Sequence, residues 1–137
     1  MFPLRVSLSA PPVSRALAVP AALGLLAVAL LHLIDGPGSL TDQFYVGGLE
    51  LALAVACVPL ALLLLTRPVR LFWHAAGALC TAALLVYIAS RTTGLPGATD
   101  DIGNWFQTLG LLNVLFQAAV IALAALVVRR RSPHSAA

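Results

Sequence analysis

The sequence predicts an all-α fold: a four-helix transmembrane bundle with both termini in the cytoplasm and an ordered second extracellular loop. Its 137 residues are 61% hydrophobic and 9% charged, with a mean hydropathy of +0.98. A soluble domain is nearer to about 45–50% apolar and about 25% charged. Four stretches reach the roughly 20 apolar residues that a bilayer core requires, and the arginines gather on one side of them. The length favours one membrane domain, 1–137, without a soluble module.

The first predicted span, 14–34, contains the run ALAVPAALGLLAVALLHLI. This run exceeds the apolar region of a signal peptide, about 7–15 residues, and lacks a small-x-small cleavage pattern, so we expect it to be retained. The other spans are 45–66, 71–90 and 107–128, and Glu50 is the one charged residue inside those three. The short RPVR turn predicts that the second and third helices are antiparallel neighbours.

Arginine placement predicts the orientation. Seven of the eight arginines would share one side of a four-span bundle, whereas Arg91 falls on the other side. Those seven are Arg5, Arg15, Arg67, Arg70, Arg129, Arg130 and Arg131. Because cytoplasmic loops are enriched in Lys and Arg, both termini should be cytoplasmic. The loops 35–44 and 91–106 should then lie outside a bacterial cell (inner) membrane.

The charge pattern argues against a nucleic-acid partner. The formal charge is +3, but the arginines lie at the ends of apolar runs and form no basic stripe, so membrane lipid is the expected partner. All eight basic residues are Arg, which with the Ala, Leu and Val content suggests a GC-rich genome such as that of an actinobacterium. The sequence has no GxSxG, P-loop, HExxH or dinucleotide-binding pattern. We therefore expect no catalytic residues, no cofactor and a non-enzymatic role.

Polar side chains inside the predicted spans are candidates for a site, because they are costly to bury without a partner. At about 1.5 Å per residue, Glu50 lies roughly 7–8 Å below the outer end of its span, Asn113 about 9 Å and Gln117 about 15 Å. Asn113 and Gln117 share one helix face, and His32 and Tyr87 lie near the outer ends of the other two spans. The pattern predicts an outward-facing polar cavity with these candidates: His32, Glu50, Tyr87, Arg91, Asn113 and Gln117.

A purely structural interpretation stays open for the same residues. Asn and Gln often join helices to one another in membranes. Tyr87 can anchor the interface, and Glu50 can snorkel or pair with Arg91. Cys57 and Cys80 lie at similar depths on neighbouring helices, without a CxxC motif, so they are either small packing residues or an interacting pair.

His32 and Asp35 share a helix face at i, i+3 spacing. With Glu50, Asp100 or Asp101 they would make a carboxylate–imidazole metal site. The pattern has a single imidazole and no HxxxH, so the metal stays unknown. A His32–Asp35 hydrogen bond with local capping at the helix end is the alternative.

The stretch SRTTGLPGATDDIGNWF, residues 90–106, is the most polar part of the chain. Gly94, Pro96 and Gly97 specify turns, and Thr99 or Asp100 is expected to cap a short helix with an acid in its first turn. We expect an ordered lid over the outer end of the bundle. Residues that would dock a partner outside the membrane are Asp35, Asp42, Asp100, Asp101, Asn104 and Trp105.

SRTTGLPGATDDIGNW and the helix after it resemble small four-helix integral membrane proteins of actinobacteria, a family usually left uncharacterised. Such sequences are expected to have a Glu-containing pattern near 106–107 and in the fourth span. This chain has Gln107, Asn113 and Gln117 in that region instead. The resemblance implies membrane class and architecture, and no activity.

Three functional hypotheses follow. The first is a non-enzymatic accessory or assembly subunit of a larger envelope complex, using the outer loops as its interaction surface. The second is a small transport or ligand-binding membrane protein, in homo-oligomeric form or alone, with the outward-facing polar cavity. The third is a membrane metal- or redox-handling protein that uses His32, Asp35 and the loop acids.

Overall fold

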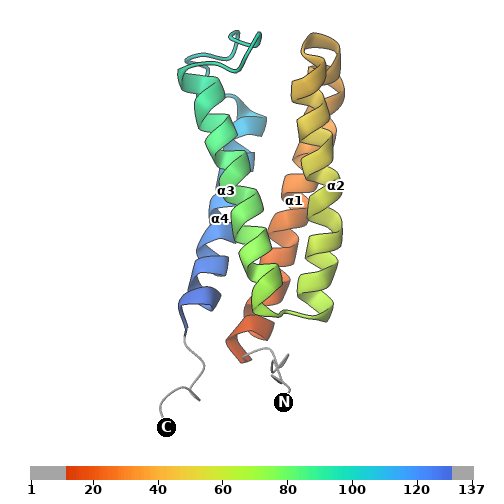
Figure 1. Ribbon diagram of the computed structural model, residues 1–137, viewed down its shortest axis with the longest axis vertical. Coiled ribbons are helices and arrows are strands. Elements are labelled where there is room, and N and C mark those ends of the chain that lie inside the picture. The colour runs from red at the N-terminus through yellow and green to blue at the C-terminus, as the bar shows by residue number, and fades with distance from the viewer. Residues whose placement is uncertain (1–11, 131–137) are drawn as a thin grey trace, which may run out of the picture.

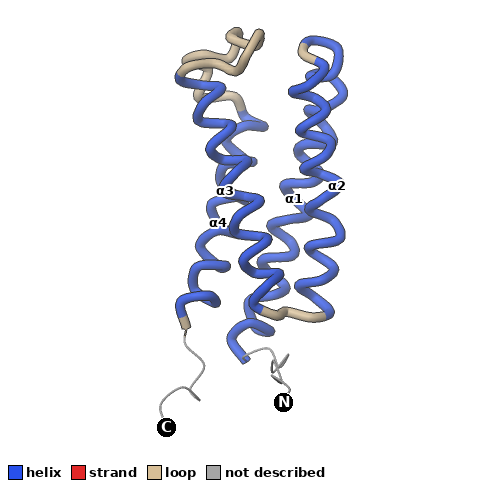
Figure 2. Tube along the Cα trace, in the orientation of Figure 1, coloured by secondary structure: helices blue, strands red, loops and turns tan. Residues whose placement is uncertain are grey.

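The computed structural model describes residues 12–130, which form four helices and no strand. They are α1 (Pro12–Asp42), α2 (Phe44–Thr66), α3 (Arg70–Thr92) and α4 (Thr108–Arg129) (Figures 1 and 2). Each is long and apolar enough to cross a membrane, which confirms the all-α class and the four candidate spans. A helix suits this environment because it pairs its own backbone groups where lipid offers no partners. Arg5 and Arg131 lie outside the described residues.

The helix α1 is longer than predicted. The first predicted span ends at 34, but α1 continues to Asp42, and Gln43 alone separates it from α2. The predicted loop 35–44 is therefore wrong. Gly36 of this segment packs against α2: a Cβ on Gly47 of α2 would fall 2.3 Å from the backbone N of Leu40 and 2.7 Å from the carbonyl O of Gly36. Small residues let membrane helices approach this closely, and that packing outweighs the turn propensity of Gly and Pro.

The four helices do not contact one another equally. α1 packs along α2, α3 packs on α4, and α1 also packs on α4, whereas the contact between α2 and α3 is much smaller than these three. Only 67–69 separate α2 from α3, and the two helices are antiparallel, as predicted, but diverge away from this turn (Figure 1). We call the end with the 67–69 turn the terminal end, because α1 begins and α4 ends there. The opposite end, with the loop 93–107, is the loop end.

The terminal end is closed by a buried hydrogen-bonded chain. Trp73, which is fully buried, donates its indole N–H to Ser14 Oγ at 2.6 Å. Ser14 Oγ in turn donates to the Pro68 carbonyl. This chain ties α1 to α3 and to the turn between α2 and α3. The divergence of α2 and α3 is thereby confined to the loop end.

Candidate functional site

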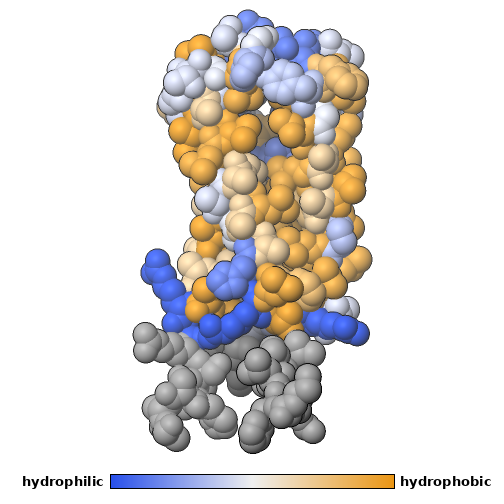
Figure 3. Space-filling view, viewed as in Figure 1, coloured by the Kyte–Doolittle hydropathy of each residue, from blue (hydrophilic) through white to orange (hydrophobic). Residues whose placement is uncertain are grey.

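A cavity of about 630 Å³ lies in the loop-end half of the bundle and is lined by all four helices and the loop. It opens where α2 and α3 diverge. Figure 3 shows a hollow on this face, with hydrophilic colour in its depth and hydrophobic colour on both sides. The structure places every residue of the sequence-predicted cavity on its wall: His32, Glu50, Tyr87, Arg91, Asn113 and Gln117.

Asn113 and Gln117 form the polar part of the cavity wall on α4. Their side chains are only 6% and 2% exposed. Within the described part of the chain, Asn113 Oδ1 and Gln117 Oε1 have no hydrogen-bond partner. An amide that joins helices would use that oxygen to accept a bond from a neighbouring helix. Both residues line the cavity, while the two oxygens themselves are buried beneath its surface.

His32 on α1 and Glu50 on α2 also hold buried polar atoms without a hydrogen-bond partner among the described residues. Both ring nitrogens of His32 and the Oε2 atom of Glu50 are buried and accept or donate no hydrogen bond among residues 12–130. The expected His32–Asp35 hydrogen bond is therefore wrong, because α1 continues as a helix past Asp35 and leaves no helix end there to cap. Four residues from three helices thus line one cavity and hold buried polar atoms without a hydrogen-bond partner among residues 12–130.

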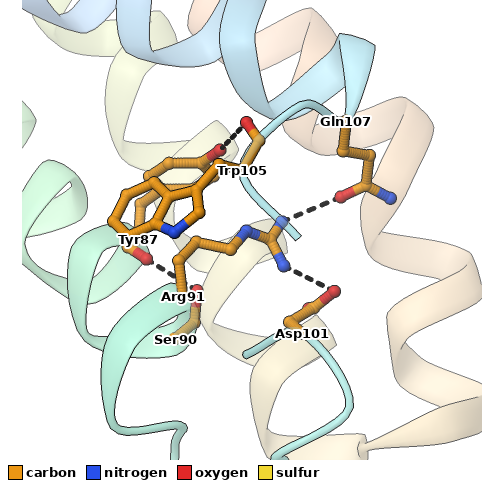
Figure 4. Close-up of polar contacts among 6 residues, drawn as sticks. All are labelled: Tyr87, Ser90, Arg91, Asp101, Trp105 and Gln107. Atoms are coloured by element: carbon orange, nitrogen blue, oxygen red, sulfur yellow. Dashed lines mark hydrogen bonds and ion pairs between the residues drawn. The ribbon is translucent and has the colours of Figure 1, made fainter. Parts of the chain in front are cut away.

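Arg91 does not pair with Glu50. Its guanidinium lies 2.5 Å from the Asp101 carboxylate and donates a 2.8 Å hydrogen bond to Gln107 Oε1 (Figure 4). The same group lies 4.9 Å from the ring centroid of Tyr87, within the range of a cation–π contact. These partners keep Arg91 only 6% exposed. The loop acid lies nearer because the chain folds back over the end of α3, where the Gly103 N–H donates to the Arg91 carbonyl at 2.9 Å.

The loop 93–107, which we call the lid, is built from turns. Gly94 ends α3 with φ +76°, and Leu95 and Ala98 exchange backbone hydrogen bonds of 2.9 Å around Pro96–Gly97, where Gly97 has φ +70°. Positive φ at the residue after Pro is the geometry of a type II turn. The predicted short helix at Thr99 or Asp100 is wrong: 99–107 continue as turns. The ties from Arg91 to Asp101 and Gly103 hold this segment against α3 instead.

Two tyrosines fix the lid at opposite sides of the cavity. Tyr45 on α2 donates its hydroxyl to the Pro96 carbonyl at 2.6 Å. Tyr87 on α3 donates to the Trp105 carbonyl at 3.2 Å, and the Tyr87 and Trp105 rings meet edge to face, 6.3 Å between centroids. The lid therefore links the two helices that diverge. Sequence reasoning missed the roles of Tyr45 and Gln107, since neither position has a signal that would name its partner.

The acids expected on an outer docking surface lie at the loop end, where Asp42, Asp100 and Asp101 are exposed. Asp35, Asp42, Asp100 and Asp101 all line the cavity, while Asn104 and Trp105 lie in the lid and are exposed. Among residues 12–130, no group of three or more His, Cys, Asp or Glu side chains is placed to hold a metal ion. The structure thus brings no third ligand to His32 and Asp35.

Comparison of the chain with protein-family models, curated proteins and solved structures finds no match in any of the three. The actinobacterial resemblance therefore stays a prediction.

Proposed function

We propose that this protein is a small membrane protein that binds a small molecule in the cavity at its loop end. One observation carries the proposal: Asn113 and Gln117 line the cavity, both are more than nine-tenths buried, and their acceptor oxygens have no partner among residues 12–130. An unsatisfied buried polar group costs about 1–3 kcal/mol. Hydrogen bonds to a ligand would offset that cost, which makes the arrangement understandable as a binding site.

The size of the space supports the same proposal. Small-molecule sites enclose about 300–1,000 Å³ and combine apolar walls with a few polar groups, and this cavity has about 630 Å³. With the orientation that the arginines predict, the lid and cavity face the outside of the cell. The protein would then take up or present a ligand that reaches it from outside the cell.

The test compares the substitution of Asn by Leu at two positions. Asn113→Leu removes an acceptor from the cavity, whereas Asn104→Leu makes the same change on the exposed lid. We expect native mass spectrometry in mild detergent to show a bound small molecule on the wild type and on Asn104→Leu, and to show much less of it on Asn113→Leu and on Glu50→Gln. If all four proteins fold and carry the same species in the same amount, the cavity is not the binding site.

The accessory-subunit hypothesis has a separate test. The proteins that co-purify in gentle detergent are identified by mass spectrometry. A stoichiometric larger partner would favour an assembly role through the lid. A homogeneous protein or homo-oligomer without a partner, with ligand bound in a Glu50-dependent way, would favour the binding role.

A further inference from the structure

The charge around the cavity is strongly one-sided. The chain has five acidic residues, and the cavity lining contains all five of them: Asp35, Asp42, Glu50, Asp100 and Asp101. Among residues 12–130, Arg91 is the one arginine that lines it, and its guanidinium is already paired with Asp101. Five carboxylates and one guanidinium leave four formal negative charges at one end of the bundle. Clustered charges of one sign beside low-dielectric walls attract ions of the opposite sign.

The walls next to these charges are apolar. Leu49, Leu53 and Ala56 on α2, and Leu79, Ala83 and Val86 on α3, line the cavity. Each set recurs at i, i+4, i+7, so each forms a stripe along one helix face. Leu49 is 57% exposed and Val86 45%, because α2 and α3 diverge here. At about 1.5 Å per residue, Ala56 lies about 18 Å from the start of α2, so the opening reaches well into the depth of the apolar span.

We propose that the ligand is an amphipathic organic cation. Its cationic group lies among the carboxylates near Glu50 and Asp35, and its apolar body lies between the α2 and α3 stripes, which it reaches from the surrounding lipid. Asn113 and Gln117 accept hydrogen bonds from donors on the ligand. This inference rests on the proposed function and adds the chemical class of the ligand.

Other ligand classes fit the observations less well. An anion would meet four net negative charges. A Ca²⁺ or Mg²⁺ ion takes about six or more oxygen ligands, whereas much of this wall is Leu, Ala and Val. A neutral apolar molecule would leave the carboxylates without a counter-charge.

The experiment uses probes of similar shape and different charge. Tetraphenylphosphonium is titrated into the full-length protein in lipid nanodiscs by isothermal titration calorimetry, in parallel with the anion tetraphenylborate and the neutral triphenylphosphine oxide. Empty nanodiscs give the background of lipid partitioning. We expect saturable binding of the cation alone, weakened about tenfold or more by Glu50→Gln and by Asp35→Asn, as expected for removal of one charge contact in a half-buried site. Arg67→Gln, at the terminal end, should bind as the wild type does.

The outcomes separate this inference from the proposed function. If the neutral probe binds as tightly as the cation and Glu50→Gln weakens neither, the cavity is a binding site but not one for cations. If the cation binds saturably with unchanged affinity in Glu50→Gln and Asp35→Asn, the inference is overturned. If none of the three probes binds above the empty nanodiscs, the cation class is rejected. The native mass spectrometry above then decides the proposed function independently.

Discussion

Arg91 and Asp101 form the one ion pair among the described residues, with 2.5 Å between guanidinium and carboxylate. The pair joins the last turn of α3 to the lid. It also engages the Arg91 guanidinium, which would otherwise be free to neutralise Glu50. The Oε2 atom of Glu50 has no partner within residues 12–130. The lid is thereby fixed and the cavity keeps its acidic character.

The Arg91–Asp101 pair predicts how the lid opens. Asp101→Asn should lower the stability of the lid by about 1 kcal/mol, the upper end for a solvent-exposed ion pair, because Asp101 is half exposed whereas Arg91 is buried. Hydrogen–deuterium exchange read by mass spectrometry should show faster exchange in peptides covering 93–107, including the Gly103 amide that bonds to Arg91. Asp100→Asn is the matched control, since Asp100 makes no ion pair in the structure. Equal exchange in the two variants would show that the pair does not hold the lid.

The contact between α1 and α2 predicts opposite effects at adjacent glycines. Gly47→Ala places a Cβ 2.3 Å from the backbone N of Leu40, where no side chain can move aside, whereas a Cβ on Gly48 meets nothing within 4 Å. Overpacking should cost Gly47→Ala about 1–3 kcal/mol or more, and Gly48→Ala should gain up to about 1 kcal/mol of helix propensity. Thermal unfolding in detergent, followed by circular dichroism, measures both. Equal melting temperatures would contradict the close packing of α1 on α2.

The buried hydrogen-bonded chain at the terminal end predicts that removing the Ser14 hydroxyl lowers the stability of the protein. Ser14→Ala leaves the Trp73 indole N–H and the Pro68 carbonyl without partners, at a cost of about 1–3 kcal/mol. Ser90→Ala is the control, because Ser90 bonds only to the Tyr87 carbonyl of its own helix. Denaturant unfolding of both variants measures the difference. Adding Trp73→Phe should cost less in the Ser14→Ala background than in the wild type, and strict additivity would indicate that the two residues are not coupled.

The cysteines predict a labelling pattern. Cys57 and Cys80 are both fully buried and both free, so a maleimide should label neither in the folded protein and both after denaturation without reductant. Asn104→Cys, on the exposed lid, should label at once and serves as the control. Resistance to labelling after denaturation, relieved by a reductant, would instead reveal a disulfide.

The polar residues show how far sequence reasoning reaches in this chain. Helical periodicity and distance from the span ends suffice to place Glu50, Asn113 and Gln117 at one end of the bundle, and the structure sets them on one cavity wall. The partner of Arg91 could not be chosen in the same way. Several carboxylates lie within its reach at the same end, and the path of the lid decides which of them pairs with it.

By itself the sequence determined four apolar helices and the end of the bundle at which polar side chains gather, because span length and helical spacing are local properties of the chain. The tertiary structure decided that α1 continues to Asp42, that α2 and α3 diverge, and that Asp101 rather than Glu50 holds Arg91. Each of these depends on contacts between distant segments: Gly47 against Leu40, Trp73 against Ser14, and the lid against α3. The free energy of such contacts comes from close packing and from competition among partners, and neither is encoded in any single stretch of residues.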